Sequence, residues 1–134
     1  RGEMIVLDAS CLVELLVGTR LGRIVAARIA DPGESLHVPH LVDVEVVQTI
    51  RRLVRDGDLD GAAARTAIEL LRSLDLERHA HEPLLDRVWA LRQNLSAYDA
   101  VYVALAEALD SRLLTCDARL SRAPGLSRRV ELIK

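Results

Sequence analysis

The chain has 134 residues, half of them apolar, which suits one domain with a sizeable core. Its formal net charge of −2 gives no electrostatic argument for nucleic-acid binding, and its only lysine, Lys134, excludes mechanisms that need a lysine inside the chain, such as a P-loop or a Schiff base. Three aromatic residues are too few for an RNA-binding sheet that stacks bases.

The longest apolar run, 100–106, is far shorter than the roughly 20 residues of a membrane span, and no charged-then-apolar leader opens the chain. We therefore expect a cytoplasmic protein without a membrane partner. We expect Met4 to be the native start and residues 1–3 to be a cloning remnant, so the single domain is expected to span 4–134. Cys11 and Cys116 lack the spacing of a metal site, and we expect both to stay reduced as small apolar residues.

The stretch 4–16 sets the expected architecture. An apolar run, 4–7, ends at Asp8, and helix-spaced apolar residues follow, which predicts a buried strand leading into a helix. The next segments predict a helix over 20–30, a strand over 36–39, and two helices over 41–55 and 59–72, the second of them capped by Asp58. The alternating segment 74–78 fits a short strand, and helices are predicted over 83–92 and 100–109. A strand over 112–116, a helical turn to 120 and a strand over 129–133 complete the chain. This alternation predicts an α/β fold with a largely parallel sheet and helices on both faces.

Four of the 20 acidic residues stand apart from solvated helix faces. Asp8 and Asp117 follow strands, Asp99 opens the most apolar helix, and Glu45 borders an apolar helix face. The carboxyl ends of parallel strands can gather such residues at one edge of the sheet. Gathered carboxylates repel one another unless a cation lies among them, and an all-oxygen site suits Mg²⁺ or Mn²⁺. These ions activate water and stabilise a leaving oxygen, which predicts phosphodiester hydrolysis.

Three of these acids also have a purely structural interpretation. Asp8 and Asp117 could cap the helices that follow them. Ser96 and Asp99 fit a capping box before an apolar run, and a capping Ser96 would also fix where Asp99 points.

Glu45 is harder to explain structurally. A glutamate beside an apolar face needs a partner, and Arg52 lies two turns further along the same helix, but a simple edge-exposed glutamate is the alternative. Asp43 is expected to be only a first-turn acid favoured by the helix dipole.

Four segments that occur in the family's order resemble the PIN-domain family, and more narrowly the VapC toxins of bacterial type II toxin–antitoxin systems. They are IVLDAS (5–10), PHLVDVEVV (39–47), LSAYDAVYVALAE (95–107) and LLTCDARL (113–120). The resemblance implies a three-layer α/β/α sandwich with a short-stranded, mostly parallel central sheet, and a metal-dependent endoribonuclease activity.

The resemblance also implies a site and partners. Mg²⁺ or Mn²⁺ would be held by the four acids, most directly by Asp8 and Asp99, with supporting hydrogen bonds from Ser10 and Thr115. The family generally forms homodimers, a cognate VapB-type antitoxin blocks the pocket, and cleavage of tRNA, rRNA or other RNA halts translation. We expect the hairpin 41–72 to receive the apolar segment of such an antitoxin.

Basic and histidine side chains allow weaker inferences. Arginines at the end of the helix 41–55 and after Asp117 could contact RNA phosphate or could simply be solvated; they are Arg51, Arg52 and Arg55, and Arg119, Arg122, Arg128 and Arg129. The four histidines form two close pairs, 37/40 and 79/81, without acid or cysteine partners at metal-site spacing. We therefore expect solvated surface histidines.

Two other functions compete with an endoribonuclease. Phosphatases with an aspartate nucleophile also place it after the first strand, but they usually carry a second aspartate where this chain has Ser10, and a downstream lysine that it lacks. A non-catalytic PIN-like binding module is the other alternative, and the complete set of four acids argues against it.

Overall fold

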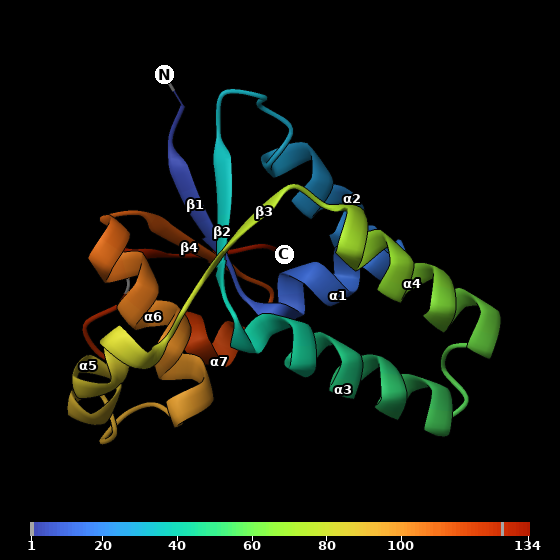
Figure 1. Ribbon diagram of the computed structural model, residues 1–134. Coiled ribbons are helices and arrows are strands. Elements are labelled where there is room, and N and C mark those ends of the chain that lie inside the picture. The colour runs from blue at the N-terminus through green and yellow to red at the C-terminus, as the bar shows by residue number, and fades with distance from the viewer. Residues whose placement is uncertain (1, 127) are drawn as a thin grey trace.

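Figure 1 shows the computed structural model, which describes residues 2–126 and 128–134. Within these residues five strands form one sheet in the order β3-β2-β1-β4-β5, and every neighbouring pair is parallel. The strands are β1 (Met4–Leu7), β2 (Ser35–Pro39), β3 (Leu76–His79), β4 (Arg112–Thr115) and β5 (Val130–Leu132). The predicted parallel sheet is confirmed.

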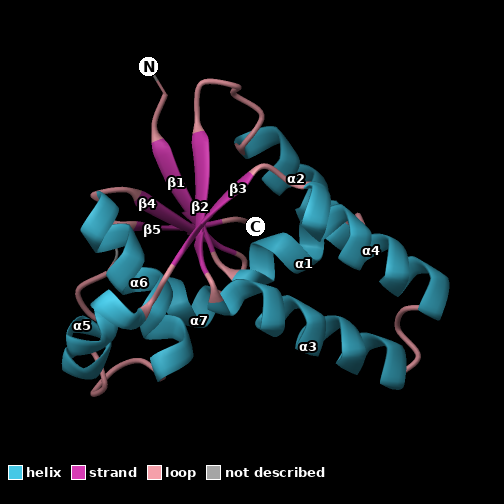
Figure 2. Cartoon of the chain, in the orientation of Figure 1, coloured by secondary structure: helices cyan, strands magenta, loops and turns pink. Residues whose placement is uncertain are grey.

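Helices cover both faces of this sheet, which completes the predicted three-layer sandwich. The helices α1 to α4 lie on one side and α5 and α6 on the other (Figures 1 and 2). The helices of the described residues are α1 (Ala9–Val17), α2 (Arg20–Arg28), α3 (Leu41–Arg55), α4 (Gly61–Ser73), α5 (Leu85–Ala90), α6 (Ala97–Leu109) and α7 (Ala118–Ser121), with a 3₁₀ turn at Glu82–Leu84. No helix in this part of the chain combines the length and the apolar character needed to cross a bilayer.

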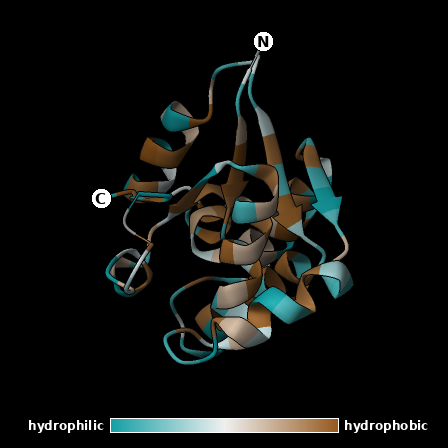
Figure 3. Ribbon diagram, turned by 90° about the vertical axis from the view of Figure 1, so that its left-hand side faces the viewer, coloured by the Kyte–Doolittle hydropathy of each residue, from teal (hydrophilic) through white to brown (hydrophobic). Residues whose placement is uncertain are grey.

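The core follows from strands that are covered on both faces. Ile5, Val6 and Leu7 of β1 are all buried, as expected for the centre of a parallel sheet. Residues 100–106 of α6 are also buried on every side, which confirms the predicted buried helix. Brown, hydrophobic segments accordingly fill the middle of the molecule in Figure 3. The α1–α2 corner requires Gly22, because a Cβ there would lie 2.0 Å from the backbone oxygen of Glu14.

Two details differ from the sequence prediction. Asp60, not Asp58, caps α4, since the side chain of Asp60 accepts from the Ala63 N–H at 2.7 Å. The N–H of Asp58 instead donates to the Leu53 oxygen at 2.8 Å, so Asp58 belongs to the turn that ends α3. The predicted helix 83–92 is a 3₁₀ turn followed by the shorter α5.

The strand order creates a crevice at the centre of the sheet. β1 lies between β2 and β4. From β2 the chain continues outward to β3 at one edge of the sheet, and from β4 it continues outward to β5 at the other edge. In parallel α/β sheets, ligands bind beyond the carboxyl ends of the strands at such a switch point. Asp8 follows β1 directly and Asp117 follows β4, so two of the predicted acids lie at this crevice.

Candidate active site at the carboxyl ends of the strands

Asp8 is the buried centre of the site, with 6% of its surface exposed. Its Oδ1 accepts from Ser10 Oγ at 2.6 Å and from the Cys11 N–H at 3.1 Å, and its Oδ2 accepts from Thr115 Oγ1 at 2.5 Å. Asp8 therefore also caps α1, as its structural interpretation predicted. Burial raises the pKa of Asp8 above its ordinary value, although these hydrogen bonds oppose the rise.

Ser10 and Thr115 connect Asp8 to the loop after β4. The Cys116 N–H donates to Ser10 Oγ at 2.9 Å, and the Asp117 N–H donates to Thr115 Oγ1 at 2.9 Å. Two hydroxyl groups therefore contact Asp8 on one side and the backbone of this loop on the other. Because Thr115 is fully buried, the position of Asp117 depends on the same hydroxyl that holds Asp8.

Glu45 lies in the second turn of α3 and is half-buried. The hydroxyl of Tyr102, on α6, donates to Glu45 Oε1, so the partner of this glutamate is Tyr102 rather than Arg52, whose guanidinium donates to Thr49. Burial raises the pKa of Glu45; the Tyr102 hydrogen bond opposes this, and the charges of Asp99 and Asp8 add to it.

Asp99 and Asp117 share one arginine. Arg119 Nη2 lies 2.9 Å from Asp117 Oδ2 and 3.4 Å from Asp99 Oδ2. Burial acts to raise the pKa of Asp117, but its hydrogen bonds from Arg119 outweigh burial and hold the pKa below its ordinary value. The predicted cap of α6 is confirmed, because Ser96 Oγ accepts from the Asp99 N–H at 3.1 Å.

The fold thus brings the four predicted acids to one place, which we call the acidic pocket: Asp8, Glu45, Asp99 and Asp117. The charge of Asp99 raises the pKa of both Asp8 and Glu45, and Arg119 joins Asp99 to Asp117. Among the described residues, however, no three of these acids bring oxygens within 4.8 Å of one another. An ion in the pocket would bind one or two carboxylates directly and keep several waters, the arrangement that Mg²⁺ favours.

Tyr102 is the pocket residue that sequence reasoning missed. It is 2% exposed and lies in the middle of the apolar run of α6, where an aromatic residue is expected to fill the core. Its position one turn after Asp99, on the same helix face, was the available signal. A buried tyrosine normally needs a partner for its hydroxyl group, and burial together with Glu45 raises the pKa of Tyr102.

Two other charged residues named in the sequence analysis, Asp43 and Arg129, have partners outside the acidic pocket. Asp43 is a first-turn acid of α3, as expected, and it also forms a two-point ion pair with Arg78 of β3 at 2.8 and 2.9 Å. Arg129 donates to the backbone oxygens of Ala106 and Ser111, so it is anchored at the end of α6.

The sulfur atoms of Cys11 and Cys116 lie 3.8 Å apart beside the pocket; Cys11 is buried, as predicted, whereas Cys116 is half-buried.

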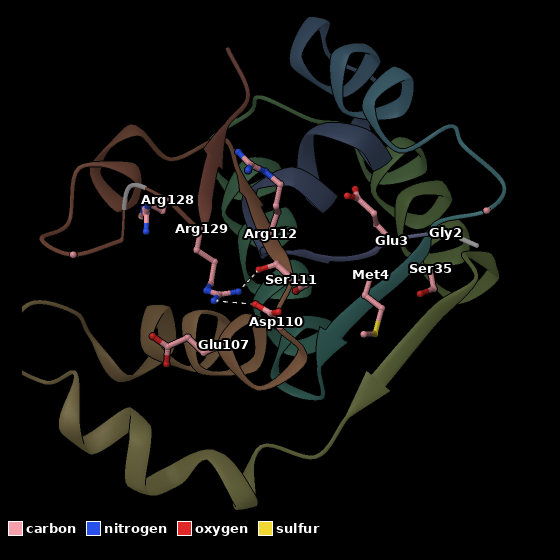
Figure 4. Close-up of a pocket in the computed structure, with 12 residues that line it drawn as sticks. Gly2, Glu3, Met4, Ser35, Glu107, Asp110, Ser111, Arg112, Arg128 and Arg129 are labelled. Carbon is pink, nitrogen blue, oxygen red and sulfur yellow. Dashed lines mark hydrogen bonds and ion pairs between the residues drawn. The ribbon is translucent and has the colours of Figure 1, made fainter.

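Two hollows border opposite ends of the sheet. A small one of about 100 Å³ is lined by Ser96, Asp99 and Arg119 and adjoins the acidic pocket. A wider one of about 940 Å³ lies at the amino ends of β1 and β4, among Met4, Arg112 and other mostly charged side chains (Figure 4). None of the four acids lines the wide hollow, so the candidate active site is not in this hollow, although it is the larger of the two.

The expectation of four solvated histidines is wrong for His37, which is 2% exposed. Its Nδ1 lies 2.8 Å from His79 Nε2 and 3.0 Å from Glu77 Oε2. We call these three residues the histidine cluster. The sequence pairs 37/40 and 79/81 are therefore not the pairs that meet, because the contacts run between β2 and β3 rather than along each segment.

The chain is similar to known proteins over most of its length. A PIN domain model matches residues 5–126. Ribonuclease VapC9 of Mycobacterium tuberculosis is 47% identical over 119 residues, which cover 88% of this chain and 89% of that protein. Ribonuclease VapC1 of the same organism is 41% identical over 130 residues, 96% and 97% of the two chains. The structure of VapBC2 from Rickettsia felis, bound to a DNA fragment from their promoter, matches in fold with a TM-score of 0.71 at 14% identity and covers 98% of this chain and 99% of that one.

Proposed function

The chain belongs to the PIN domain family, and from this membership we propose that it is a VapC-type ribonuclease toxin that hydrolyses RNA phosphodiester bonds and is neutralised by a cognate VapB-type antitoxin. The observation that carries the proposal is the acidic pocket at the switch point of the sheet. The charge of Asp99 raises the pKa of both Asp8 and Glu45, in a chain whose relatives are named ribonucleases.

The donor set of the pocket fits Mg²⁺ or Mn²⁺. All four candidate ligands offer oxygen, and a cation among them would oppose the rise in the pKa of Asp8 and Glu45 and so favour their ionised forms. Such an ion activates water and neutralises charge on the phosphodiester. We assign direct ion contacts to Asp8 and Asp99, with Glu45 and Asp117 completing the negative field.

The neighbouring side chains would keep these acids in place. Ser10 and Thr115 orient Asp8 through hydrogen bonds to its two oxygens, and Ser96 fixes the start of α6 and hence Asp99. Arg119 is 72% exposed at the pocket rim. When an ion balances Asp99 and Asp117, the Arg119 guanidinium is free to contact an RNA phosphate.

The proposed partners other than RNA are the antitoxin and a second copy of the chain in a homodimer. The outward face of α3 carries exposed Val44, Val47 and Val54, and Leu70 of α4 is also exposed. An apolar antitoxin segment could bind along this hairpin, because partner helices commonly dock on such faces.

The alternative phosphatase function finds little support at Asp8. Ser10 stands where such phosphatases usually carry a second aspartate, its hydroxyl donates to Asp8, and the chain has no lysine downstream except Lys134. A non-catalytic module remains the competing outcome of the experiment below.

The test is cleavage of bulk RNA by the purified chain with Mg²⁺ or Mn²⁺. Asp8→Asn and Asp99→Asn should each lower the rate by about 100-fold or more, since each removes charge that holds the ion. Asp43→Asn is the matched control, because Asp43 lies on the same helix as Glu45 but pairs with Arg78. If the two pocket variants cleave as fast as the parent, the proposal is wrong; if the folded parent neither cleaves RNA nor binds either ion, a non-catalytic module is favoured.

A further inference from the structure

The histidine cluster is assembled by the parallel pairing of β2 with the edge strand β3. His37 is directly opposite Glu77 in the register of these strands. Alternate residues of a strand share a face, so His79 lies on the same face as Glu77, and Ser35 on the same face as His37. The ladder continues past the cluster, because the His40 N–H donates to the His79 oxygen at 2.8 Å.

Three potential ligand atoms converge in this cluster. His37 Nδ1, His79 Nε2 and Glu77 Oε2 form a triangle with sides of 2.8, 3.0 and 3.7 Å. Bond lengths of about 2.0–2.1 Å place the ligand atoms of a tetrahedral zinc ion about 3.3 Å apart. The mean side of the triangle is close to that separation. Within the described residues, no other three such side chains bring donor atoms within 4.8 Å of one another.

The outer nitrogen of His37 is also engaged, as in most metal-binding histidines. Its Nε2 lies 2.8 Å from Ser35 Oγ. A proton on Nε2, donated to Ser35, leaves a lone pair on Nδ1 that faces a carboxylate oxygen and another imidazole nitrogen. Three lone pairs then point into one space, and a shared cation would satisfy all of them.

We propose that His37, Glu77 and His79 bind one Zn²⁺ ion that fastens the edge strand β3 to β2. Two imidazoles and one carboxylate suit zinc, whereas an all-oxygen set suits magnesium. The fourth position faces water, because Glu77 is 66% exposed beside the buried His37. The cluster shares no residue with the acidic pocket, so the proposal does not depend on ribonuclease activity.

Zinc titration of the metal-stripped full chain, followed by calorimetry, tests the proposal. With Mg²⁺ in large excess to occupy the acidic pocket, we expect one Zn²⁺ per chain and a rise in melting temperature as zinc is added, because an ion that binds only the folded state stabilises it. Co²⁺ at the same site should give the visible absorption of a tetrahedral complex. Glu77→Gln should weaken binding by about 10-fold or more, and His79→Ala by about 100-fold; Ser35→Ala, which removes the outer hydrogen bond, should weaken it by about 10-fold.

His40→Ala and Asp8→Asn are the matched controls, because His40 is an exposed histidine next to β2 and Asp8 belongs to the acidic pocket. Both should keep the zinc affinity of the parent. Glu77 is an exposed position, so Glu77→Gln should fold normally, as circular dichroism can verify. The proposal is overturned if the parent binds no zinc at a 100-fold excess of zinc over protein; the three residues are then only a hydrogen-bonded group. It is also overturned if Asp8→Asn, rather than His79→Ala, removes zinc binding.

Discussion

The acidic pocket and the histidine cluster are built in different ways. The pocket collects its side chains from beyond the strand ends and from the first two turns of α3 and α6, whereas the cluster takes all three from inside two paired strands. Hydroxyl groups hold the pocket acids individually, at Asp8 and Glu45. In the cluster, strand register alone decides which residues meet. Removing a hydroxyl group that contacts a pocket acid should therefore damage the first region and leave the second intact.

Thr115→Val should give the largest difference between the two regions. It leaves Asp8 Oδ2 and the Asp117 N–H without their common partner in a buried place. We expect RNA cleavage to fall by about 10- to 100-fold and the free energy of unfolding by about 1–3 kcal/mol, as measured by cleavage rates and urea denaturation. Zinc affinity should not change.

Thr49→Val on α3 is the control for Thr115→Val, because the Thr49 hydroxyl accepts a hydrogen bond from the exposed Arg52 and lies outside the acidic pocket. Equal loss of cleavage in both variants, or a loss of zinc affinity in Thr115→Val, would show that the two regions are not independent.

The metal-free pocket should make stability depend on pH. The pKa values of Asp8 and Glu45 are raised in the fold, mainly by burial. Between the ordinary and the raised values the native state keeps protons that the unfolded chain has released, so the contribution of Asp8 and Glu45 to the stability of the metal-free protein should fall as pH rises through that window. Each unit of pKa difference corresponds to about 1.4 kcal/mol.

Thermal melts at a series of pH values, with chelator and then with Mg²⁺, measure this dependence. Mg²⁺ should oppose the loss, since it favours the ionised acids, and its stabilising effect should grow with pH. If the stability of the parent in chelator, measured relative to that of Asp8→Asn, rises with pH through this window, the direction of the Asp8 pKa shift is contradicted.

Tyr102→Phe should have a smaller effect. It removes the hydrogen bond to Glu45 and keeps the ring that fills the core. Because that hydrogen bond lowers the pKa of Glu45, losing the bond should raise the pKa of Glu45 further. In a plot of RNA cleavage rate against pH, the rise on the acidic side should then move to higher pH. We expect a loss of about 1 kcal/mol in stability. Tyr98→Phe, at an exposed tyrosine, should change neither quantity; a profile that does not move would argue against a role for Glu45.

The contrast between the regions also explains what the sequence can reveal. Asp8, Asp99 and Asp117 could be predicted to meet, because strand ends and helix starts recur at fixed places in a parallel sheet. The partner of Glu45 could not, since Tyr102 looks like any core aromatic until α3 and α6 are placed against the same sheet. The histidine cluster could not either, because it depends on which residue of β3 faces His37, and periodicity does not fix register.

Breaking the Arg78–Asp43 ion pair should have the smallest effect on stability, and it tests whether the two regions share a support. Arg78 lies between Glu77 and His79 on β3 but points to the opposite face, where it holds Asp43 of α3. Since both side chains are partly exposed, Arg78→Gln should cost about 0.2–1 kcal/mol in urea denaturation. Asp43→Asn should cost a similar amount, and the double variant should cost less than the sum of the two, because both break one interaction. If the register of β3 is set by its backbone ladder, zinc affinity should change by less than about twofold in all three variants. A tenfold loss would mean instead that the ion pair positions β3, and the cluster would then share its support with the helix that carries Glu45.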